Sequence, residues 1–471
     1  MAHPNRDTRA DSDTRHALLV IAAGVVAALH VGKLPPALDV LRADFGLGLA
    51  EAGLLLSMIQ IAGMTVGVLL GAWVDAIGSS RGLRFGLVLL AFASVAGAFS
   101  TSAAALLAWR AVEGVGFLFS VLAAPPLIRA LVGASRLRQL MGLWGTYMPL
   151  GFALALVGGP AVIALSGWRG WWVVVGAATA VAAGVVTRLI PADRVNVRTS
   201  AVPVAARSSE PGGEPDRGPR FRPDGEPAGE RERADGALAL RGATASTGLV
   251  PRLRETLGHR GPWLVALCFA VYSAQWLAVV GFLPLVVAQF GVAPAMAGVL
   301  TAIVSLANAA GNMLGAGLLH RGHRATRLIA AGFTFMAIGS FATYAQVGGE
   351  PDIARVLAHD RFLSIEMAAR YAAMVAFSFV GGLIPASLFA LAALMAPSER
   401  TLGSTVGWMQ QWSALGQFAG PPLAGWMAGA VGGWQFTWVM TAGLSAAGLG
   451  LAALTARHPR VRAATADARR R

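Results

Sequence analysis

The chain has 471 residues, of which 55 % are apolar and only 13 % are charged. With apolar runs of roughly 20 residues, this composition is typical of an integral membrane protein and argues against a soluble domain. The net charge of +14 comes from arginines, because Lys33 is the only lysine. Most arginines lie in loops and tails rather than on one folded face, so we expect no nucleic-acid binding.

Other classes of protein are excluded by what the motifs lack. The single cysteine, Cys268, lies inside an apolar run, which argues against a disulfide framework or a thiol metal site. The eight histidines show no metal-ligand spacing, and no Gly-x-x-x-x-Gly-Lys-Ser/Thr phosphate loop is present. We therefore expect no enzyme activity, no cofactor or metal, and no direct use of ATP.

The first part of the chain is a short tail followed by six apolar spans. Residues 1–15 are polar and mixed in charge, and residues 16–190 are predicted to form an N-terminal six-helix bundle. Each span is long enough to cross about 30 Å of hydrocarbon as a helix. The spans lie near residues 16–38, 51–74, 83–101, 104–128, 139–165 and 170–190.

The second part of the chain repeats this organisation after a linker. Residues 191–260 are rich in Pro, Gly, Arg and Glu, a composition that predicts a flexible cytoplasmic linker. Residues 261–456 are predicted to form a C-terminal six-helix bundle, and residues 457–471 a basic cytoplasmic tail. The spans lie near residues 262–288, 294–319, 326–346, 368–396, 402–427 and 433–456.

The distribution of arginines predicts the orientation in the membrane, because cytoplasmic loops carry the excess of positive charge. With the N-terminus inside, the cytoplasmic loops contain Arg81, Arg84, Arg129, Arg136, Arg138, Arg321, Arg324, Arg327 and Arg400. Three of the outer loops, near residues 102, 290 and 430, contain no lysine or arginine. We therefore expect a multi-pass protein of the cytoplasmic (inner) membrane with both termini in the cytoplasm.

The loop after the second span carries a recognisable pattern. It has glycines at Gly71 and Gly78, an acid at Asp75 and a base at Arg81. This pattern resembles the loop signature Gly-x-x-x-Asp-Arg-x-Gly-Arg-Arg of the major facilitator superfamily, although Ala76 stands where the family has its first arginine. The resemblance implies that these four residues gate the cytoplasmic side, with Asp75 stabilising one state.

The fourth span contains a second family-like pattern. Arg110, Glu113, Gly114 and Gly116 resemble the Arg-x-x-x-Gly-x-Gly signature of the same family, whose arginine is associated with proton-coupled movement. Charges inside the hydrocarbon must face protein or a wet cavity, so an intramembrane ion pair is a functional candidate. Spaced i,i+3, Arg110 and Glu113 can also pair locally, so a static pair that only orients helices is the alternative.

Several sequence motifs of the first half recur in the same order in the second half. The pattern of Gly71 and Gly78 recurs at Gly315 and Gly322, 244 residues on. Three further correspondences link the first and seventh, the fifth and eleventh, and the sixth and twelfth spans. Internal repeats of this kind predict an all-α polytopic membrane protein, with 12 transmembrane helices in two pseudo-symmetric six-helix bundles around a central cavity.

His30 and Lys33 place polarity on one side of this pseudo-symmetric cavity. Spaced i,i+3, they share a helix face, and we expect this to be the cavity face because lipid offers a lysine no partner. The matching positions of the second half, Val279 and Phe282, are apolar. Lys33 is therefore predicted to carry the counter-charge of a bound solute. The alternative is that Lys33 snorkels to the outer interface.

Other polar side chains fall at mid-depth, and as amides and phenols they can hydrogen-bond a solute without fixing its charge. The candidate substrate-binding residues in addition to His30 and Lys33 are Tyr147, Tyr272, Gln275, Asn308 and Gln410. Each of them is also suited to bridging helices.

The leading prediction is a secondary active transporter that moves a small anionic or polar solute by alternating access, driven by a proton gradient. Gly32-Lys33-Leu34-Pro35-Pro36 together with Tyr147-Met148-Pro149-Leu150-Gly151 resembles the cyanate-permease-like branch of small-anion porters. The expected partners are the solute, protons and the lipid bilayer, and we expect a monomer. The alternatives are an efflux antiporter for lipophilic drugs, and a transporter-fold sensor that signals through its linker.

Overall fold

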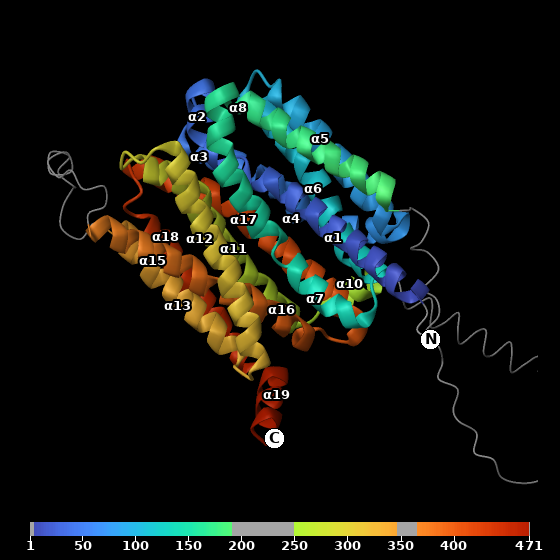
Figure 1. Cartoon of the computed structure of the whole chain (residues 1–471). Coiled ribbons are helices and arrows are strands. Elements are labelled where there is room, and N and C mark those ends of the chain that lie inside the picture. Colours follow the sequence, from blue (N-terminus) through green and yellow to red (C-terminus); the bar gives the residue numbers. More distant parts are fainter. Residues whose placement is uncertain (1–3, 191–248, 346–364, 471) are drawn as a thin grey trace, which may run out of the picture.

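The computed structural model describes residues 4–190, 249–345 and 365–470, and the long elements in these ranges are all helices (Figure 1). The first half consists of α1 (Pro4–Gly32), η1 (Pro35–Ala37), α2 (Leu38–Phe45), α3 (Leu49–Ser57), η2 (Met58–Gln60), α4 (Ile61–Ile77), α5 (Ser79–Ala98), α6 (Ala103–Leu131), α7 (Ala134–Trp144) and α8 (Tyr147–Leu189). The predicted all-α fold is confirmed.

The second half begins with a short helix inside the predicted linker. It consists of α10 (Leu249–Leu257), α11 (Arg260–Ala288), α12 (Pro294–His320), α13 (Ala325–Tyr344), α15 (Ile365–Gly381), α16 (Leu383–Met395), η4 (Glu399–Thr401), α17 (Leu402–Val431), α18 (Thr437–Arg457) and α19 (Pro459–Arg470). Residues 191–248 of the predicted linker lie outside the described residues. Both predicted tails are largely helical, in α1 and α19.

Ten helical stretches of the described chain are long and apolar enough to cross a membrane. One of them contains two spans, because α8 turns at Gly167, whose φ of 68° lies in the left-handed region that favours glycine. α17 is the remaining crossing segment; its 30 residues span about 45 Å at 1.5 Å per residue, although its glutamines lower its hydropathy. The twelve predicted crossings are thus accounted for.

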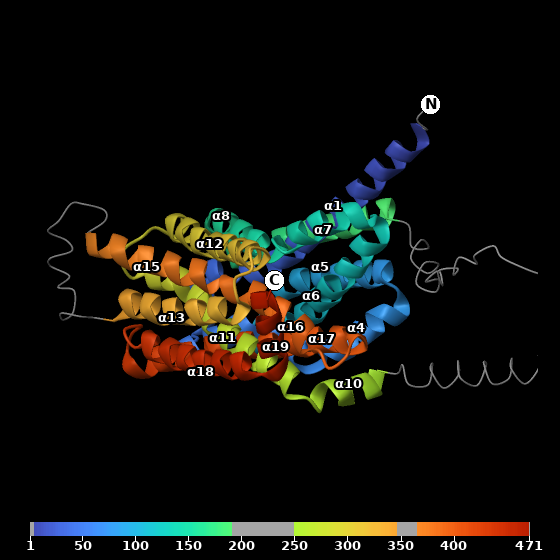
Figure 2. The same cartoon turned by 90° about the horizontal axis from the view of Figure 1, so that it is seen from below.

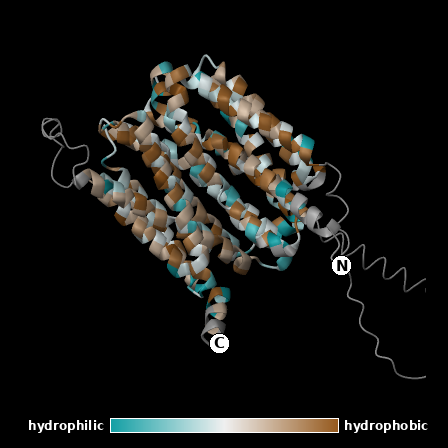
Figure 3. Ribbon diagram, viewed as in Figure 1, coloured by the Kyte–Doolittle hydropathy of each residue, from teal (hydrophilic) through white to brown (hydrophobic). Residues whose placement is uncertain are grey.

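The two halves repeat the same packing. In the first half, α1 packs on the first arm of α8 and α5 packs on α6; in the second half, α11 packs on α17 and α13 packs on α15. Figure 2 shows the arrangement from below, with α10 close to the end of α17. Apolar residues dominate the lengths of the helices (Figure 3), as expected for segments surrounded by lipid.

The halves meet through close contacts between α3 and α17 and between α8 and α12. A side chain on Gly53 would overlap the backbone of Pro421, and one on Gly298 would overlap the backbone of Leu156. These glycines let the helices of opposite halves approach to backbone distance, as small residues do between transmembrane helices. The contacts lie toward the ends predicted to face outside and close that side of the molecule.

Candidate functional site

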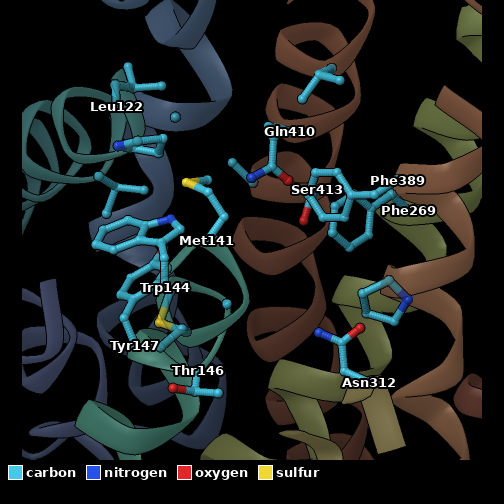
Figure 4. A pocket seen from close by; sticks show the side chains of 18 of the residues that line it. Leu122, Met141, Trp144, Thr146, Tyr147, Phe269, Asn312, Phe389, Gln410 and Ser413 are labelled. Atoms are coloured by element: carbon cyan, nitrogen blue, oxygen red, sulfur yellow. The ribbon is translucent and has the colours of Figure 1, made fainter. Parts of the chain in front are cut away.

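A central cavity of about 1610 Å³ lies between the two halves. Figure 4 shows Met141, Trp144 and Tyr147 on the wall formed by the first half, and Phe269 and Phe389 on the wall formed by the second. Gln410 of α17 is exposed and points into this space. Most of the lining is apolar or aromatic, with a small number of amides and hydroxyls, which is the usual composition of a small-molecule site.

Four of the predicted substrate-binding residues line this cavity: Tyr147, Tyr272, Asn308 and Gln410. The Tyr147 ring stacks on Trp144 with 4.2 Å between ring centroids. The Asn308 amide donates to the Tyr272 hydroxyl at 2.9 Å and to the Ser378 carbonyl at 2.8 Å. These bonds fix the orientation of two polar side chains, so the cavity wall is pre-organised there.

The charged residues that line the cavity are all arginines. Arg136, Arg252 and Arg400 lie at its edge, and no aspartate or glutamate is among the described lining residues. Arg136 and Arg400 are exposed. They belong to the loops predicted to be cytoplasmic, so the cavity opens on that side, opposite the glycine contacts of α3 with α17.

Two hydrogen-bond links cross from one half to the other beside the cavity. The Gln60 amide donates to the Gln417 carbonyl oxygen at 2.9 Å, and the Gln411 amide donates to the backbone carbonyl of Met64 at 2.9 Å. On the far side of Gln417, its own amide donates to Ser413 at 3.3 Å. Any motion that separates α4 from α17 must therefore break these bonds.

A second polar centre lies inside the first half, among α1, α5, α6 and α8. Its charged and titratable members, which we call the buried charge cluster, are His30, Lys33, Arg110 and Glu113, and each is 0 % exposed. Glu113 accepts from Lys33 on Oε1 and from Arg110 Nη1 on Oε2, the latter at 2.5 Å. Groups this deeply buried must be paired, since an isolated charge in a membrane protein interior is very costly.

Lys33 has two further partners that hold its ammonium group. Its Nζ donates to Ser94 Oγ at 2.8 Å and lies 4.5 Å from the centroid of the Trp172 ring. Because Ser94 uses its own proton on the carbonyl of Trp172, at 2.8 Å, the hydroxyl can only accept from Lys33. The ammonium is thus stabilised by a carboxylate, a hydroxyl and an aromatic face together.

Arg110 joins the cluster to the backbone of α1. Its Nη1 donates to the carbonyl of His30 at 2.8 Å as well as to Glu113. Its Nε and Nη2 have no hydrogen-bond partner among the described residues. With Lys33 and Arg110 cationic and Glu113 anionic, the cluster carries one more positive than negative charge.

The structure places three predicted substrate-binding residues elsewhere than the cavity wall. His30 and Lys33 share one face of the chain, as their spacing predicts, but that face points at α6 and α8 rather than into the cavity. Lys33 does not snorkel either, since it is fully buried. Gln275 is buried too, and its Oε1 accepts from Ser445 at 3.1 Å. The sequence signal for the true pairing was the presence of Lys33 in the first apolar span and of Glu113 in the fourth, because each charge needs a partner inside the membrane.

The predicted gating loop forms the sharp turn between α4 and α5. Gly78 has a φ of 96°, and Gly322, its counterpart between α12 and α13, has a φ of 87°. Arg81 is exposed. The side chain of Asp75 and the surroundings of Gly71 lie outside the described residues. The matching turns support the internal repeat.

Two bundles of crossing helices around a cavity that opens to one side define a multi-pass membrane transporter. The chain belongs to the Major Facilitator Superfamily, whose family model matches residues 20–353 and again residues 265–471. The overlap of the two matches agrees with the repeated halves.

Solved structures with this fold include a bacterial homologue of the human lysosomal transporter Spinster. Its inward-facing, unoccupied conformation has a TM-score of 0.68 and 15 % identity, with 95 % of this chain and 97 % of that chain covered. Its inward-facing, occupied conformation has a TM-score of 0.69 and 15 % identity, with 94 % and 97 % covered. No curated protein sequence matches the chain. At this identity the likeness establishes the fold.

Proposed function

We propose that this transporter is a secondary active carrier that moves a small anionic or polar solute across the cytoplasmic membrane by alternating access, coupled to protons. Both termini lie in the cytoplasm, and the cavity of the described state is open to that side. The positive-inside rule supports this orientation, because Arg136, Arg252 and Arg400 all lie at the open end. We propose a monomer as the working unit.

The observation that carries the choice of solute is the charge of the cavity lining. Three arginines and no acid line the described wall, so the local potential attracts anions and repels cations. Tyr147, Tyr272, Asn308 and Gln410 supply donors and acceptors for the solute within the cavity. The small-anion porter branch remains a prediction.

Proton coupling is assigned to the buried charge cluster rather than to the cavity wall. Val31 and Gly114, the sequence neighbours of the cluster on α1 and α6, line the cavity, so Arg110 and Glu113 lie directly behind the wall. Lys33 and His30 are sealed from the solute in the described state and therefore belong with coupling. A change in the charge of this cluster alters the packing of four helices at once.

Alternating access requires the two sides of the molecule to exchange roles. In the described state the glycine contacts of α3 with α17 and of α8 with α12 close the outer side. Opening that side must separate these backbones and close the space between α7 and α16. We propose that Gly71, Asp75, Gly78 and Arg81 stabilise one of the two states at the cytoplasmic end of α4.

Efflux of a lipophilic compound is the second candidate, and the aromatic lining favours it. Trp144, Phe269 and Phe389 present large apolar surfaces to the cavity. The arginines set a limit on this alternative, because a lipophilic cation would meet charges of its own sign at the cavity mouth.

A thermal-shift screen of the purified protein separates these candidates. Small inorganic and carboxylate anions, neutral sugars and cationic dyes such as ethidium should be compared at equal ionic strength. Stabilisation by an anion, followed by its uptake into proteoliposomes under an imposed pH gradient, is the expected result. Stabilisation by the dyes alone would contradict it and support efflux. Gradient-independent uptake would contradict proton coupling.

A further inference from the structure

The two ring nitrogens of His30 have different neighbours. Nε2 lies 2.8 Å from Oγ1 of Thr179, and that hydroxyl donates its only proton to the carbonyl of Val175, also at 2.8 Å. The hydroxyl must therefore accept from His30, which makes Nε2 the protonated nitrogen of the neutral ring. Nδ1 consequently carries the lone pair.

Nδ1 of His30 has no hydrogen-bond partner among the described residues, although it is completely buried. It lies 3.7 Å from Oε1 of Glu113. Two acceptors thus face each other at a distance too long for a hydrogen bond. A proton on Nδ1 would convert this pair into a donor and an acceptor of opposite charge, which is the strong kind of hydrogen bond.

The other members of the cluster are already committed. Both oxygens of Glu113 accept from cations, so a proton there would leave Lys33 and Arg110 without their shared counter-charge. Lys33 must be a donor, since the proton of Ser94 is used on the carbonyl of Trp172. The open acceptor of the cluster is therefore Nδ1 of His30.

We propose that Nδ1 of His30 is the proton-binding atom of the transport cycle, and that its protonation draws Oε1 of Glu113 from Lys33 to His30. The inference rests on the proton-coupled function proposed above. When the cluster is opened to water, a hydronium ion gives its proton to the Nδ1 lone pair and leaves as water, the ring becomes an imidazolium, and Lys33 keeps its own proton. The same N–H bond breaks when the proton leaves.

The groups that face His30 come from every helix packed around it. They are Lys33, three residues further along the same segment, Arg110 and Glu113 of α6, and Thr179 of α8. Ser94 of α5 contacts the cluster through its hydrogen bond with Lys33. An added charge on His30 raises the repulsion between three cations that share one carboxylate. Lys33 is the cation expected to lose its contact with Glu113, because it is bonded to Oε1, the oxygen that also faces Nδ1 of His30.

The position of Lys33 shows what this change would move. α1 ends at Gly32 and η1 begins at Pro35, so Lys33 lies at the joint between the two helices. Its carbonyl accepts from the Trp171 indole of α8 at 2.9 Å. Release of the Lys33 side chain would remove one of the contacts that fix the junction between α1 and η1. The bond from Trp171 of α8 to the Lys33 carbonyl would remain.

Because Lys33 is the only lysine, its Nζ can be observed alone by NMR after selective ¹⁵N-lysine labelling of the full-length protein in detergent micelles. In the wild type we expect the Nζ resonance to shift through one step as the pH is lowered and the imidazole of His30 takes up a proton. In His30→Gln the side-chain amide can still donate to Thr179, but the titrating nitrogen is gone, so the step should be lost.

Two outcomes would overturn the proposal: a step of the same size in His30→Gln, or an invariant Nζ resonance in the wild type. If His30→Gln fails to fold, Thr179→Val provides the second test. Loss of the Nε2 partner should move the midpoint of the step, and an unmoved midpoint would count against the proposal. The NMR signal requires neither solute nor a proton gradient. A negative result would therefore rule out His30 as the proton-binding residue without ruling out proton-coupled transport.

Discussion

The two halves of the protein share one fold but differ in what fills equivalent places. In the first half, His30 and Lys33 on the first crossing helix meet Arg110 and Glu113. In the second half, the matching residues Val279 and Phe282 are buried in apolar surroundings, with the Phe282 ring 4.8 Å from that of Trp434. The fold itself therefore does not need charges at these positions, which supports the proposed role of the cluster in the transport cycle.

The largest expected effect comes from removing the one acid of the cluster. Glu113→Gln leaves Lys33 and Arg110 buried without a counter-charge, and breaking a buried pair in this way typically costs about 3 to 5 kcal/mol. We expect a large fall in the thermal stability of the purified protein and no transport. Thermal unfolding followed by intrinsic fluorescence provides the measurement.

Lys33→Met is the matched control, because it leaves Glu113 and Arg110 paired one to one. It should cost less than half as much stability as Glu113→Gln. Equal losses in the two variants would show that the cluster acts through packing alone, as its apolar counterpart around Phe282 does.

The contact between the halves offers the next test. A methyl group on Gly425 of α17 would overlap the backbone of Leu49, whereas one on Gly429, one turn further along, would meet open space. Gly425→Ala should therefore disfavour the described state, typically by about 1 to 3 kcal/mol for overpacking. Labelling of a Gln410→Cys reporter by an impermeant maleimide from the cytoplasmic side should slow several-fold. Gly429→Ala should leave the rate unchanged, and equal rates in both variants would contradict this assignment.

The hydrogen bond between Gln60 and Gln417 joins the halves on the other side of the same interface. Its loss in Gln60→Leu should cost the described state about 0.5 to 1.5 kcal/mol, which is roughly a two- to tenfold shift in population. The same maleimide assay reports it. Thr65→Val is the control, because among the described residues the Thr65 hydroxyl of α4 bonds only to the Ile61 carbonyl of its own helix, at 2.7 Å. An effect of similar size in the control would assign the shift to α4 itself.

The smallest effect concerns the cavity wall of the second half. Tyr272→Phe removes the hydrogen bonding between the Tyr272 hydroxyl and the Asn308 side chain but leaves the bond from the Asn308 amide to the Ser378 carbonyl. Binding of an anion identified in the thermal-shift screen should weaken by about two- to fivefold, within the range for one neutral hydrogen bond. Tyr371→Phe, which loses a bond to the Leu300 carbonyl away from the cavity, should not alter the affinity. Unchanged binding in Tyr272→Phe would remove Tyr272 from the site.

Much of the fold could be predicted because it is encoded locally. Apolar length defines the crossing helices, and the recurrence of Gly71 and Gly78 at Gly315 and Gly322 defines the halves. Helix α8 corresponds to two predicted spans, near residues 139–165 and 170–190, and Ser166, Gly167 and Arg169 interrupt the apolar run between them. Four residues of the cavity wall could also be predicted, because polar side chains at mid-depth avoid the helix faces that contact lipid.

The position of Lys33 could not be predicted in the same way. The spacing of His30 and Lys33 fixes that they share a face, but not which neighbouring helix that face meets. This depends on the rotation of α1 against α6 and α8, which is set by contacts far apart in the sequence, such as that of Gly32 with the backbone of Phe152. The Thr179 partner of His30, 149 residues away, left no local signal.

The tight turn at Gly167 divides α8 into two helical arms that are joined by a single residue. Its first arm carries Leu156, against which Gly298 of the opposite half rests, and its second arm carries Trp172 and Thr179, which touch Lys33 and His30. A turn made by one residue limits how far one arm can move independently of the other. If a change in the cluster turned the second arm, the backbone at Gly167 would pass that rotation to the first arm and so to the contact between Leu156 and Gly298.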